Sequence, residues 1–439
     1  MDRFVSFAKQ FSINETDKLV IERAKLILLD SITAMALGNK YEKIIKLTKS
    51  IDNENAGQVP LIGTNKLIEK RDAAFINGIA MVSNELDEGN PKAKGHPAAH
   101  FLPALLSLSM TEGISGAKLL KAFIVNYEIS ARLGETLQLD DEIHPHGNWG
   151  VFGNGFGVGT LLDWIEDEHY IQAAMLSSSF SFPTLWKSVL EGHEVRNVII
   201  GLNNYNTMLL PHLINARYTA SISTGKGIYG GILARQVTDY SFDFEEEFYL
   251  LHTYFKFYPY CRFCHAPIDA TLELIKNICF EDIKSIHIDT YSLAAKLNSQ
   301  EVANSFAGMF SIPYALAQEL YKFYEAKLDV SVDKEQIISE LMKKIIVTEN
   351  EQYTKNLLKG RITAVKIELS DGTFKEKIVD RAKGDADEAG LYDKVLTKNQ
   401  EMLNRIFGET KAEKLIENLL HLDELENVSQ LSALLVASK

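Results

Sequence analysis

Cysteine is scarce in this 439-residue sequence, which contains only Cys261, Cys264 and Cys279. An odd, sparse set does not provide a disulfide framework and is typical of a reducing compartment. Long apolar runs are also missing, since no stretch of about eighteen apolar residues occurs. The first residues lack the basic start, apolar run and cleavage site of a signal peptide. We therefore expect a cytoplasmic protein that does not span a membrane.

Positive charge is in deficit. The 46 Lys and Arg residues are outnumbered by 59 Asp and Glu residues, which gives a formal net charge of -13. An acidic protein repels nucleic acid and anionic membrane surfaces, so neither is an expected partner. An anionic small molecule would need locally concentrated His, Lys and Arg side chains. With 46% hydrophobic residues, the chain can bury a large core and divide into two domains.

Helical periodicity dominates the first 250 residues. Apolar residues recur at helical spacing from Glu15 to about Gly38, behind Asn14 as a candidate N-cap. No segment in this part has the pattern of a parallel sheet. Similar patterns predict helices over residues 68–82, 101–111, 117–133, 151–164 and 222–235.

The pattern changes after about residue 250. Strands are predicted around residues 286–291 and 345–347, and a hairpin is predicted where segments 362–369 and 374–379 flank Ser370-Asp371-Gly372. Helical periodicity returns from about Lys398, and this segment is expected to pack on the first domain. We predict a mainly α protein. A large all-helical domain comprises residues 1–255 with 396–439, and a smaller α+β lid domain comprises residues 256–395.

Three short motifs match cofactor-binding patterns only in part. Cys261-Arg262-Phe263-Cys264-His265 has the spacing of a haem-attachment motif, but that attachment normally occurs outside the cytosol, and no second cysteine pair completes a zinc site. The glycine-rich segment 153–159 lacks G-x-G-x-x-G spacing and a preceding strand, and residues 224–227 lack the outer residues of a phosphate loop. We therefore expect no cofactor.

Histidines cluster in three compact segments that each contain proline. These segments hold five of the eleven histidines, and this concentration indicates one shared site. Turn-rich segments position functional side chains, whereas an isolated histidine is more often structural. The five residues are His96, His100, His144, His146 and His265.

A metal hydrolase is one alternative for the first histidine segment. His96 and His100 are four residues apart, a spacing that places both imidazoles on one face of a helix. Glu85, Asp87 and Glu88 lie shortly upstream, so a His/carboxylate metal site can be assembled from these residues. A solvated loop explains the acidic residues equally well. We favour a site without metal.

Taken in order, these and further segments resemble the MmgE/PrpD family, which includes 2-methylcitrate dehydratase, cis-aconitate decarboxylase and iminodisuccinate epimerase. The resemblance covers nearly the whole chain and rests on the order and spacing of its pieces. It implies a large helical domain made from both chain ends, a smaller α+β lid and a homodimer. The segments are Leu29-Asp30-Ser31-Ile32, 75–80, 85–88, Gly95-His96-Pro97, 125–129, 144–147, 256–261, Ile268-Asp269 and 310–314.

The resemblance also implies site residues. We predict catalytic roles for His144, His96, Lys256 and Tyr314. Two departures from the family pattern occur: Ala216 stands at the usual family lysine, and Gly89 stands where the decarboxylase has threonine. The predicted substrate-binding residues are Glu85, Asp87, His146, Arg217 and His265.

Removal of a proton next to a carboxylate needs a base and donors where negative charge develops. Neutral His144 fits the base, with Lys256 and His96 holding carboxylates and Tyr314 donating a proton, although the roles of the two histidines are interchangeable. We predict a metal-independent lyase, of dehydratase or hydratase type, acting on a di- or tricarboxylate in one cleft. An epimerase or other isomerase, a decarboxylase, and an inactive ligand-binding homologue marked by Ala216 are the alternatives.

Overall fold

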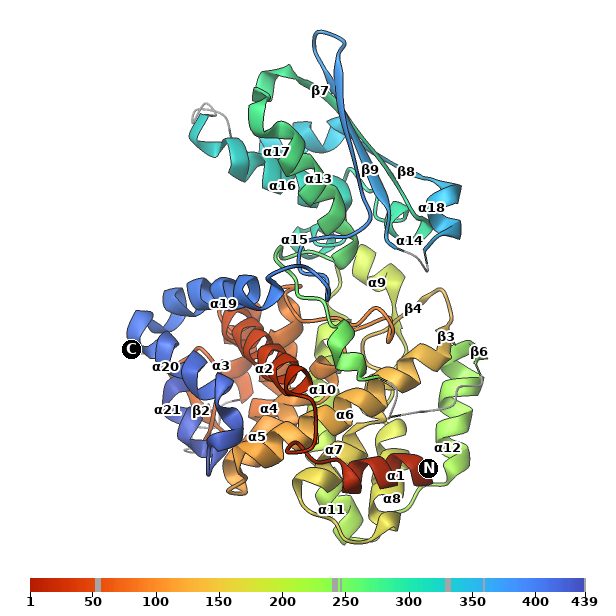
Figure 1. Cartoon of the computed structure of the whole chain (residues 1–439), viewed down its shortest axis with the longest axis vertical. Helices are drawn as coiled ribbons and strands as arrows, with labels where there is room; N and C mark the ends of the chain where they lie inside the picture. Colours follow the sequence, from red (N-terminus) through yellow and green to blue (C-terminus); the bar gives the residue numbers. More distant parts are fainter. Residues whose placement is uncertain (52–56, 239–243, 245–246, 328–332, 358–359, 438–439) are drawn as a thin grey trace. The chain divides into compact units, whose positions relative to one another are not determined.

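The structure is a computed structural model that describes residues 1–51, 57–238, 244, 247–327, 333–357 and 360–437 (Figure 1). The protein is mainly α-helical, as predicted. Two compact units form. Unit 1 contains residues 1–186, 195–255 and 386–439, and unit 2 contains residues 187–194 and 256–385.

The described residues of unit 1 form a group of packed helices with three small two-stranded sheets, so the unit is not purely helical. The sheets pair β1 (Val59–Pro60) with β2 (Leu67–Ile68), β3 (Leu137–Leu139) with β6 (Ala234–Val237), and β4 (Ile143–His144) with β5 (Thr184–Leu185), all antiparallel. The helices are α1 (Asp2–Gln10), α2 (Lys18–Gly38), α3 (Glu42–Ile51), α4 (Lys70–Ser83), α5 (Leu102–Thr111), α6 (Gly116–Thr136), α7 (Asn154–Leu161), α8 (Asp167–Ser178), α10 (Val195–Thr207), α11 (Leu210–Asn215), α12 (Ile222–Gly227), α19 (Leu391–Phe407), α20 (Glu409–Leu420) and α21 (Ser432–Leu435).

Two predicted helix boundaries in unit 1 are wrong. The N-cap of α2 is Asp17, whose carboxylate accepts a hydrogen bond from the backbone N–H of Leu19 at 2.8 Å, and Asn14 lies in the preceding turn. The helix predicted over residues 222–235 becomes a π-helix over Ile228–Leu233 and then strand β6. Its four glycines between 225 and 231 explain the change, because glycine weakens an α-helix.

Helices from the N-terminal and C-terminal parts of the chain pack together within unit 1, where α2 lies against both α4 and α19 (Figure 1). Asp30 of α2 is buried and forms an ion pair with Lys398 of α19. The Asp30 carboxylate also accepts a hydrogen bond from the Asn399 side chain at 3.0 Å. A buried charge is costly unless it is paired, so this contact holds helix α19 against helix α2.

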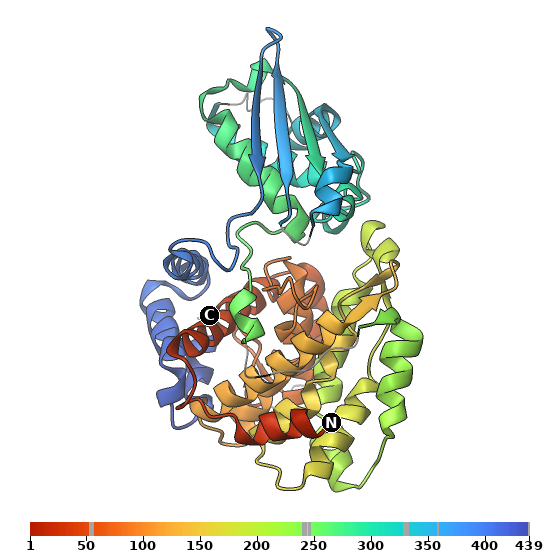
Figure 2. The same ribbon diagram turned by 45° about the vertical axis from the view of Figure 1, so that its right-hand side comes forward.

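Unit 2 is built on a four-stranded sheet in the order β10-β9-β7-β8. The strands are β7 (Ile283–Thr290), β8 (Ile345–Glu349), β9 (Thr363–Leu369) and β10 (Phe374–Val379); β7 and β8 are parallel and the other pairs are antiparallel. Helices α13, α16 and α17 contact the sheet (Figure 2). The helices are α13 (His265–Leu274), α14 (Ser292–Ala295), α15 (Ser305–Gly308), α16 (Ile312–Tyr324), α17 (Lys334–Lys344) and α18 (Glu351–Lys355), and α9 (Trp186–Leu190) lies at the junction of the units in sequence.

The predicted strands and hairpin of unit 2 are confirmed, since β9 and β10 pair across Ser370-Asp371-Gly372. Alternate residues such as Ile286 and Ile288 are buried, which is the pattern of a sheet with one covered face. The role of this unit as a lid stays a prediction.

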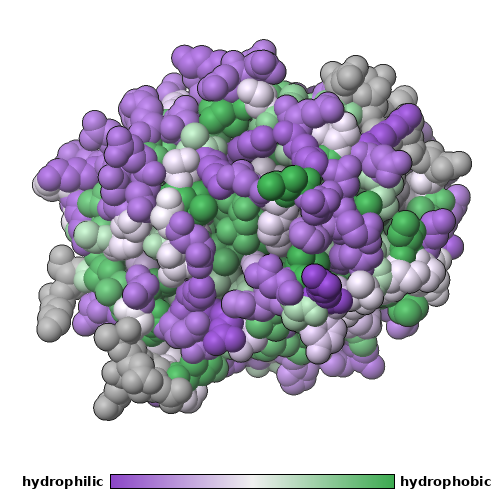
Figure 3. All heavy atoms as spheres, turned by 90° about the horizontal axis from the view of Figure 1, so that it is seen from below, coloured by the Kyte–Doolittle hydropathy of each residue, from purple (hydrophilic) through white to green (hydrophobic). Residues whose placement is uncertain are grey.

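One face of the molecule carries mostly hydrophilic side chains, with hydrophobic ones in smaller areas between them (Figure 3). None of the helices in the described ranges combines the length and apolar character needed to cross a membrane.

The Asp30–Lys398 pair gives a test of the joint between the chain ends. Lys398→Met leaves the buried Asp30 carboxylate without its cation, so we expect a loss of about 3 to 5 kcal/mol in the free energy of unfolding. Urea unfolding followed by circular dichroism measures it. The double variant Asp30→Leu/Lys398→Met removes both charges and should recover much of the loss. Equal stability of Lys398→Met and the wild type would contradict the importance of this contact.

Candidate active site

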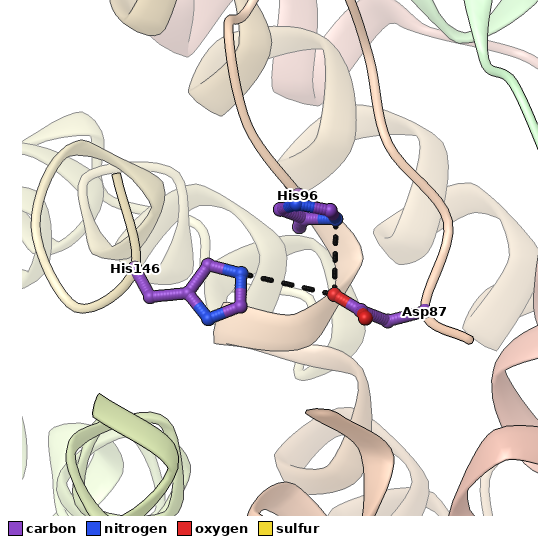
Figure 4. A group of neighbouring side chains, drawn as sticks. All are labelled: Asp87, His96 and His146. Atoms are coloured by element: carbon purple, nitrogen blue, oxygen red, sulfur yellow. Dashed lines mark ion pairs between the residues drawn. The ribbon is translucent and has the colours of Figure 1, made fainter. Parts of the chain in front are cut away.

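Residues from two of the histidine segments meet in unit 1 (Figure 4). The loop after α4 carries Asp87 and His96, and the turn after β4 carries His146. One oxygen of Asp87, Oδ2, lies 3.0 Å from Nδ1 of His96 and 3.7 Å from Nε2 of His146. The two imidazole rings are edge to face at 4.7 Å. The predicted clustering of these three residues is therefore present in the fold.

Local backbone contacts hold the two loops. In the first loop, the Asn90 side chain accepts hydrogen bonds from the backbone N–H groups of Lys92 and Ala93, and Asn90 pairs with Gly95 in an antiparallel bridge. In the second loop, Gly147 has φ +94°, a conformation that side chains disfavour. Thr184 of β5 donates its hydroxyl hydrogen to the carbonyl of His146 at 2.6 Å. These turn residues place the imidazoles.

His96 has a defined tautomer when it is neutral. Its Nδ1 lies 2.6 Å from the carbonyl oxygen of Glu88 and 3.0 Å from Oδ2 of Asp87. A carbonyl oxygen only accepts, so Nδ1 carries the hydrogen. The lone pair is therefore on Nε2, in a side chain that is 13% exposed. This arrangement is suited to accepting a proton.

His144 has the opposite tautomer. Its Nδ1 accepts a hydrogen bond from the backbone N–H of His146 at 3.1 Å, so the hydrogen of the neutral ring is on Nε2. The ring lies in β4 against Trp186, with a centroid distance of 4.3 Å. Neutral His144 thus presents an N–H at Nε2, which suits hydrogen-bond donation better than proton removal.

His146 is held by an arginine that the sequence analysis did not identify. Nη1 of Arg196 donates a hydrogen bond to Nδ1 of His146 at 2.7 Å, because guanidinium has no acceptor. The hydrogen of the ring is therefore on Nε2, the atom nearest Asp87. Burial, and then the charge of Arg196, holds the pKa of His146 well below its usual value, so the ring stays neutral.

Both ring nitrogens of His100 form hydrogen bonds with backbone groups. Its Nδ1 donates to the carbonyl of His96 at 3.0 Å, and its Nε2 accepts from the backbone N–H of Gly147 at 3.0 Å. Burial lowers the pKa of His100 to about 4. The predicted α-helical face shared by His96 and His100 is wrong, because only a short 3₁₀ turn forms there, over Ala98–His100, and His96 precedes it.

Arg196 lies on α10, whose buried face is mostly polar. Arg196, Asn203 and Asn204 are buried there together with Ile200, whereas Val195 and Val198 are exposed. Hydrophobic residues normally mark the buried side of a helix, so this inversion hid the element from periodicity. A polar stripe at helical spacing was the available signal, since Arg196, Asn203 and Thr207 recur at intervals of seven and four residues.

Glu85, predicted to bind substrate, forms a buried ion pair with Arg196. Its φ is +51°, a left-handed conformation that is uncommon for residues other than glycine. Such strain persists only where surrounding contacts enforce it, and it concentrates at functional sites. The ion pair thus holds Glu85 in this conformation beside the site.

Glu88 is a second buried carboxyl beside the site. One of its oxygens accepts a hydrogen bond from the backbone N–H of Ala98 at 2.9 Å, and the other accepts from the Tyr127 hydroxyl at 3.1 Å. Burial raises the pKa of Glu88 to about 8 and raises that of Tyr127 well above its usual value. Glu88 therefore stays protonated near neutral pH and fixes the His96 loop without adding charge.

Three predicted residues belong to unit 2. Lys256 is buried. Tyr314, on the first turn of α16, is half-buried, and burial raises its pKa. Both nitrogens of His265 are engaged: Nδ1 accepts from Arg262 and Nε2 donates to the carbonyl of Tyr260, each at 3.2 Å. The predicted convergence of Lys256 and Tyr314 with the histidines stays a prediction.

The two positions that depart from the family pattern lie in unit 1. Ala216 and Arg217 are exposed after α11, and Arg217 has φ +61°. Gly89 pairs with Tyr254 in an antiparallel bridge, and a Cβ added at Gly89 would lie 2.2 Å from the Tyr254 hydroxyl. A larger residue at position 89 therefore requires Tyr254 to move.

Asp87, His96 and His146 offer nitrogen and oxygen atoms within 4.8 Å of one another, a spacing that could hold a metal ion. The tautomers oppose it, because Nδ1 of His96 and Nε2 of His146 both carry hydrogen, and a metal needs a lone pair at those atoms. Metal-binding histidines usually donate their other N–H to an acceptor, but the other nitrogen of His146 faces Arg196. A metal at this position would therefore require at least one of the two rings to change its tautomer.

Glu88 predicts a pH dependence of stability. The pKa of Glu88 is about 8 in the folded protein, whereas the ordinary value for a glutamate, which applies to the unfolded chain, is 4.5. Its contribution to the free energy of unfolding is therefore fully present below pH 4.5 and is lost as the pH rises through about 8. Glu88→Gln mimics the protonated carboxyl at every pH. Urea unfolding should show the variant gaining stability relative to wild type from about pH 5 to about pH 9. The exposed variant Glu409→Gln should follow the wild-type profile; parallel profiles for Glu88→Gln would contradict the raised pKa.

A second prediction concerns metal. We expect purified protein to hold no stoichiometric zinc or iron, and we expect added Zn²⁺ not to raise the unfolding temperature through Asp87. Elemental analysis and thermal unfolding, before and after chelation, measure both. Stoichiometric metal that is retained by the wild type and lost in Asp87→Asn would overturn the tautomer assignment.

Comparison with known proteins accounts for most of the chain. The model of the MmgE/PrpD N-terminal domain matches residues 2–185, and that of the MmgE/PrpD C-terminal domain matches residues 258–424. The cis-aconitate decarboxylase-like protein OryM of Aspergillus oryzae is 31% identical over 126 residues, which span 27% of this chain and only 26% of that protein. With both domain models matched in order, the chain belongs to the MmgE/PrpD family.

Proposed function

We propose that this protein is a lyase, of dehydratase or hydratase type, that acts on a small di- or tricarboxylate by removing a proton next to a carboxylate. The family includes dehydratases and decarboxylases, which supports an enzyme of this general class. The observation that carries the proposal is the Asp87–His96 pair, in which a carboxylate orients an imidazole whose other nitrogen is basic.

His96 is the proposed base. Its Nδ1–H is donated to the Glu88 carbonyl, which fixes the ring beside the Asp87 carboxylate and leaves the Nε2 lone pair for a substrate proton. When Nε2 takes that proton the ring becomes a cation, and Asp87, 3.0 Å away, stabilises it. Of the two roles that the sequence left interchangeable, the hydrogen bonds therefore favour His96 as base and His144 as donor.

Negative charge develops on the substrate carboxylate as the proton leaves, so donors there lower the barrier. Neutral His144 has an N–H at Nε2 for that purpose, since its Nδ1 is occupied by the backbone of His146. Lys256 and Tyr314 are proposed, as the sequence predicts, to hold a second carboxylate and to donate a proton to the leaving group. No metal is proposed, because the nitrogens facing Asp87 carry hydrogen.

Decarboxylation is the second candidate, because OryM is named as cis-aconitate decarboxylase-like. The packing at Gly89 argues against assigning the decarboxylase activity to this protein. The resemblance places a threonine of the decarboxylase at this position, and here even a Cβ would meet the Tyr254 hydroxyl at 2.2 Å. We therefore expect weak or absent activity on cis-aconitate and 2-methylcitrate, with a related polycarboxylate preferred.

The test is incubation with a panel of di- and tricarboxylates in deuterium oxide, followed by NMR. Unsaturated product with solvent deuterium in recovered substrate supports the lyase, and exchange without net product replaces it by an epimerase. Efficient release of carbon dioxide from cis-aconitate, without exchange, would overturn both the lyase and the substrate argument. Failure to exchange or convert any acid would favour a ligand-binding homologue.

Variants separate the two histidines in the same assay. His96→Gln removes the base, so exchange should fall at least about 100-fold. His144→Gln keeps an N–H donor and should retain slow exchange. His421→Gln, an exposed histidine of unit 1, is the matched control and should behave as wild type. A larger defect in His144→Gln than in His96→Gln would reverse the assignment.

A further inference from the structure

We infer that Arg196 is a positioning residue that sets the polarity of a series of charged and polar contacts running from Glu85 through Arg196, His146 and Asp87 to His96. The inference rests on the proposed function, because it assigns Arg196 an effect on the base of that reaction. It concerns residues of unit 1 alone.

The first part of the series is fixed by chemistry. Arg196 is buried, with its side chain 1% exposed, and its guanidinium can only donate. One nitrogen pairs with the Glu85 carboxylate, and another donates to Nδ1 of His146 at 2.7 Å. The lone pair of His146 must therefore be on Nδ1, and its hydrogen on Nε2. Glu85 keeps its strained left-handed backbone, with φ +51°, while it makes this pair.

The second part of the series meets at a single atom. Nε2 of His146 and Nδ1 of His96 approach the same oxygen of Asp87, Oδ2, from two directions (Figure 4). The contact with His96 is 3.0 Å long and that with His146 is 3.7 Å long, and both are electrostatic contacts rather than aligned hydrogen bonds. At the longer distance the N–H dipole still attracts the carboxylate, because both groups are fully buried.

The alternative tautomer shows what Arg196 does. With hydrogen on Nδ1, His146 would lose the Arg196 hydrogen bond, and its Nε2 lone pair would face Asp87 Oδ2. Two lone pairs facing each other repel, which would favour protonation of Asp87 or its rotation away from His96. His96 would then lose the anion that orients it and stabilises its protonated form. Arg196 thus keeps Asp87 available to His96 by acting through His146.

The tautomer of His146 can be read directly. In protein labelled with ¹⁵N-histidine, long-range ¹H–¹⁵N spectra distinguish a protonated ring nitrogen from one with a lone pair, and His146→Gln identifies the signals among the eleven histidines. We expect the wild-type ring to be neutral with hydrogen on Nε2. A wild-type spectrum with hydrogen on Nδ1 overturns the proposal without any variant.

The variant to test is Glu85→Gln/Arg196→Met. It removes both charges of the buried pair together, so neither charge is left buried without its partner. Its matched control is Glu128→Gln/Arg132→Met, which removes another buried Glu–Arg pair of unit 1, on α6. We expect the test variant to shift the His146 tautomer and to lower kcat roughly 10- to 100-fold with little change in KM, as loss of an outer positioning partner does. The control should keep the His146 spectrum.

The outcomes separate this inference from the proposed function. An unchanged His146 tautomer and unchanged kcat in a folded test variant overturn the role of Arg196, even where deuterium exchange supports the lyase. A His146 tautomer that shifts only in the test variant supports the proposed series of contacts from Glu85 to His96, even where no acid of the panel reacts. Arg196→Lys serves if the double variant does not fold: its single ammonium cannot hold both partners in the geometry of guanidinium, and full wild-type kcat with it overturns the role.

Discussion

One carboxylate oxygen organises the candidate site. Oδ2 of Asp87 faces the Nδ1–H of His96 and the Nε2–H of His146, in surroundings from which water is excluded around Asp87 and His146. A buried carboxylate is costly unless hydrogen-bond donors compensate it. The tautomers of the surrounding histidines are set by the Glu88 carbonyl, the His146 backbone N–H and Arg196, and two of the three rings place an N–H toward this oxygen. The loops that carry these histidines are held by hydrogen bonds of the Asn90 and Thr184 side chains and by the backbone conformation at Gly147.

The rest of the site limits how much charge is buried. Glu88 keeps its proton, His100 and His146 stay neutral, and the charges of Glu85 and Arg196 compensate each other. Partly exposed His96 is the ring placed to change its protonation state during a reaction. An acidic protein with neutral imidazoles does not attract a polycarboxylate by itself, so the proposed substrate requires cations elsewhere in the site, and the sequence points to Lys256 for that role.

The sequence predicted the fold class and the hairpin of unit 2 because periodicity and turn residues report which side of an element is buried. It placed Asp87, His96 and His146 in one site because clustered histidines and a family resemblance pointed to the same loops. It missed Arg196, since α10 buries asparagine, threonine and arginine and exposes valine, which reverses the usual pattern. It also left the base undecided, because a tautomer depends on partners such as the Glu88 carbonyl and the His146 backbone N–H, which only the fold brings into contact.

The Asp87–His96 pair also bears on which reaction follows proton removal. In the proposed reaction, His96 would take the substrate proton, and Asp87 would stabilise the imidazolium and so lengthen the time for which the proton stays there. A proton held in this way either returns to carbon or passes to a departing hydroxyl, and the two outcomes correspond to an isomerase and a lyase. The base is common to both, so the second donor decides between them. A neutral His144 carries its hydrogen on Nε2 and is held by the backbone, which under the proposed function suits it to binding a carboxylate rather than to acting as a mobile acid. The lyase therefore depends on a further proton donor such as Tyr314, whereas the isomerase would place its second donor on the opposite face of the substrate carbon.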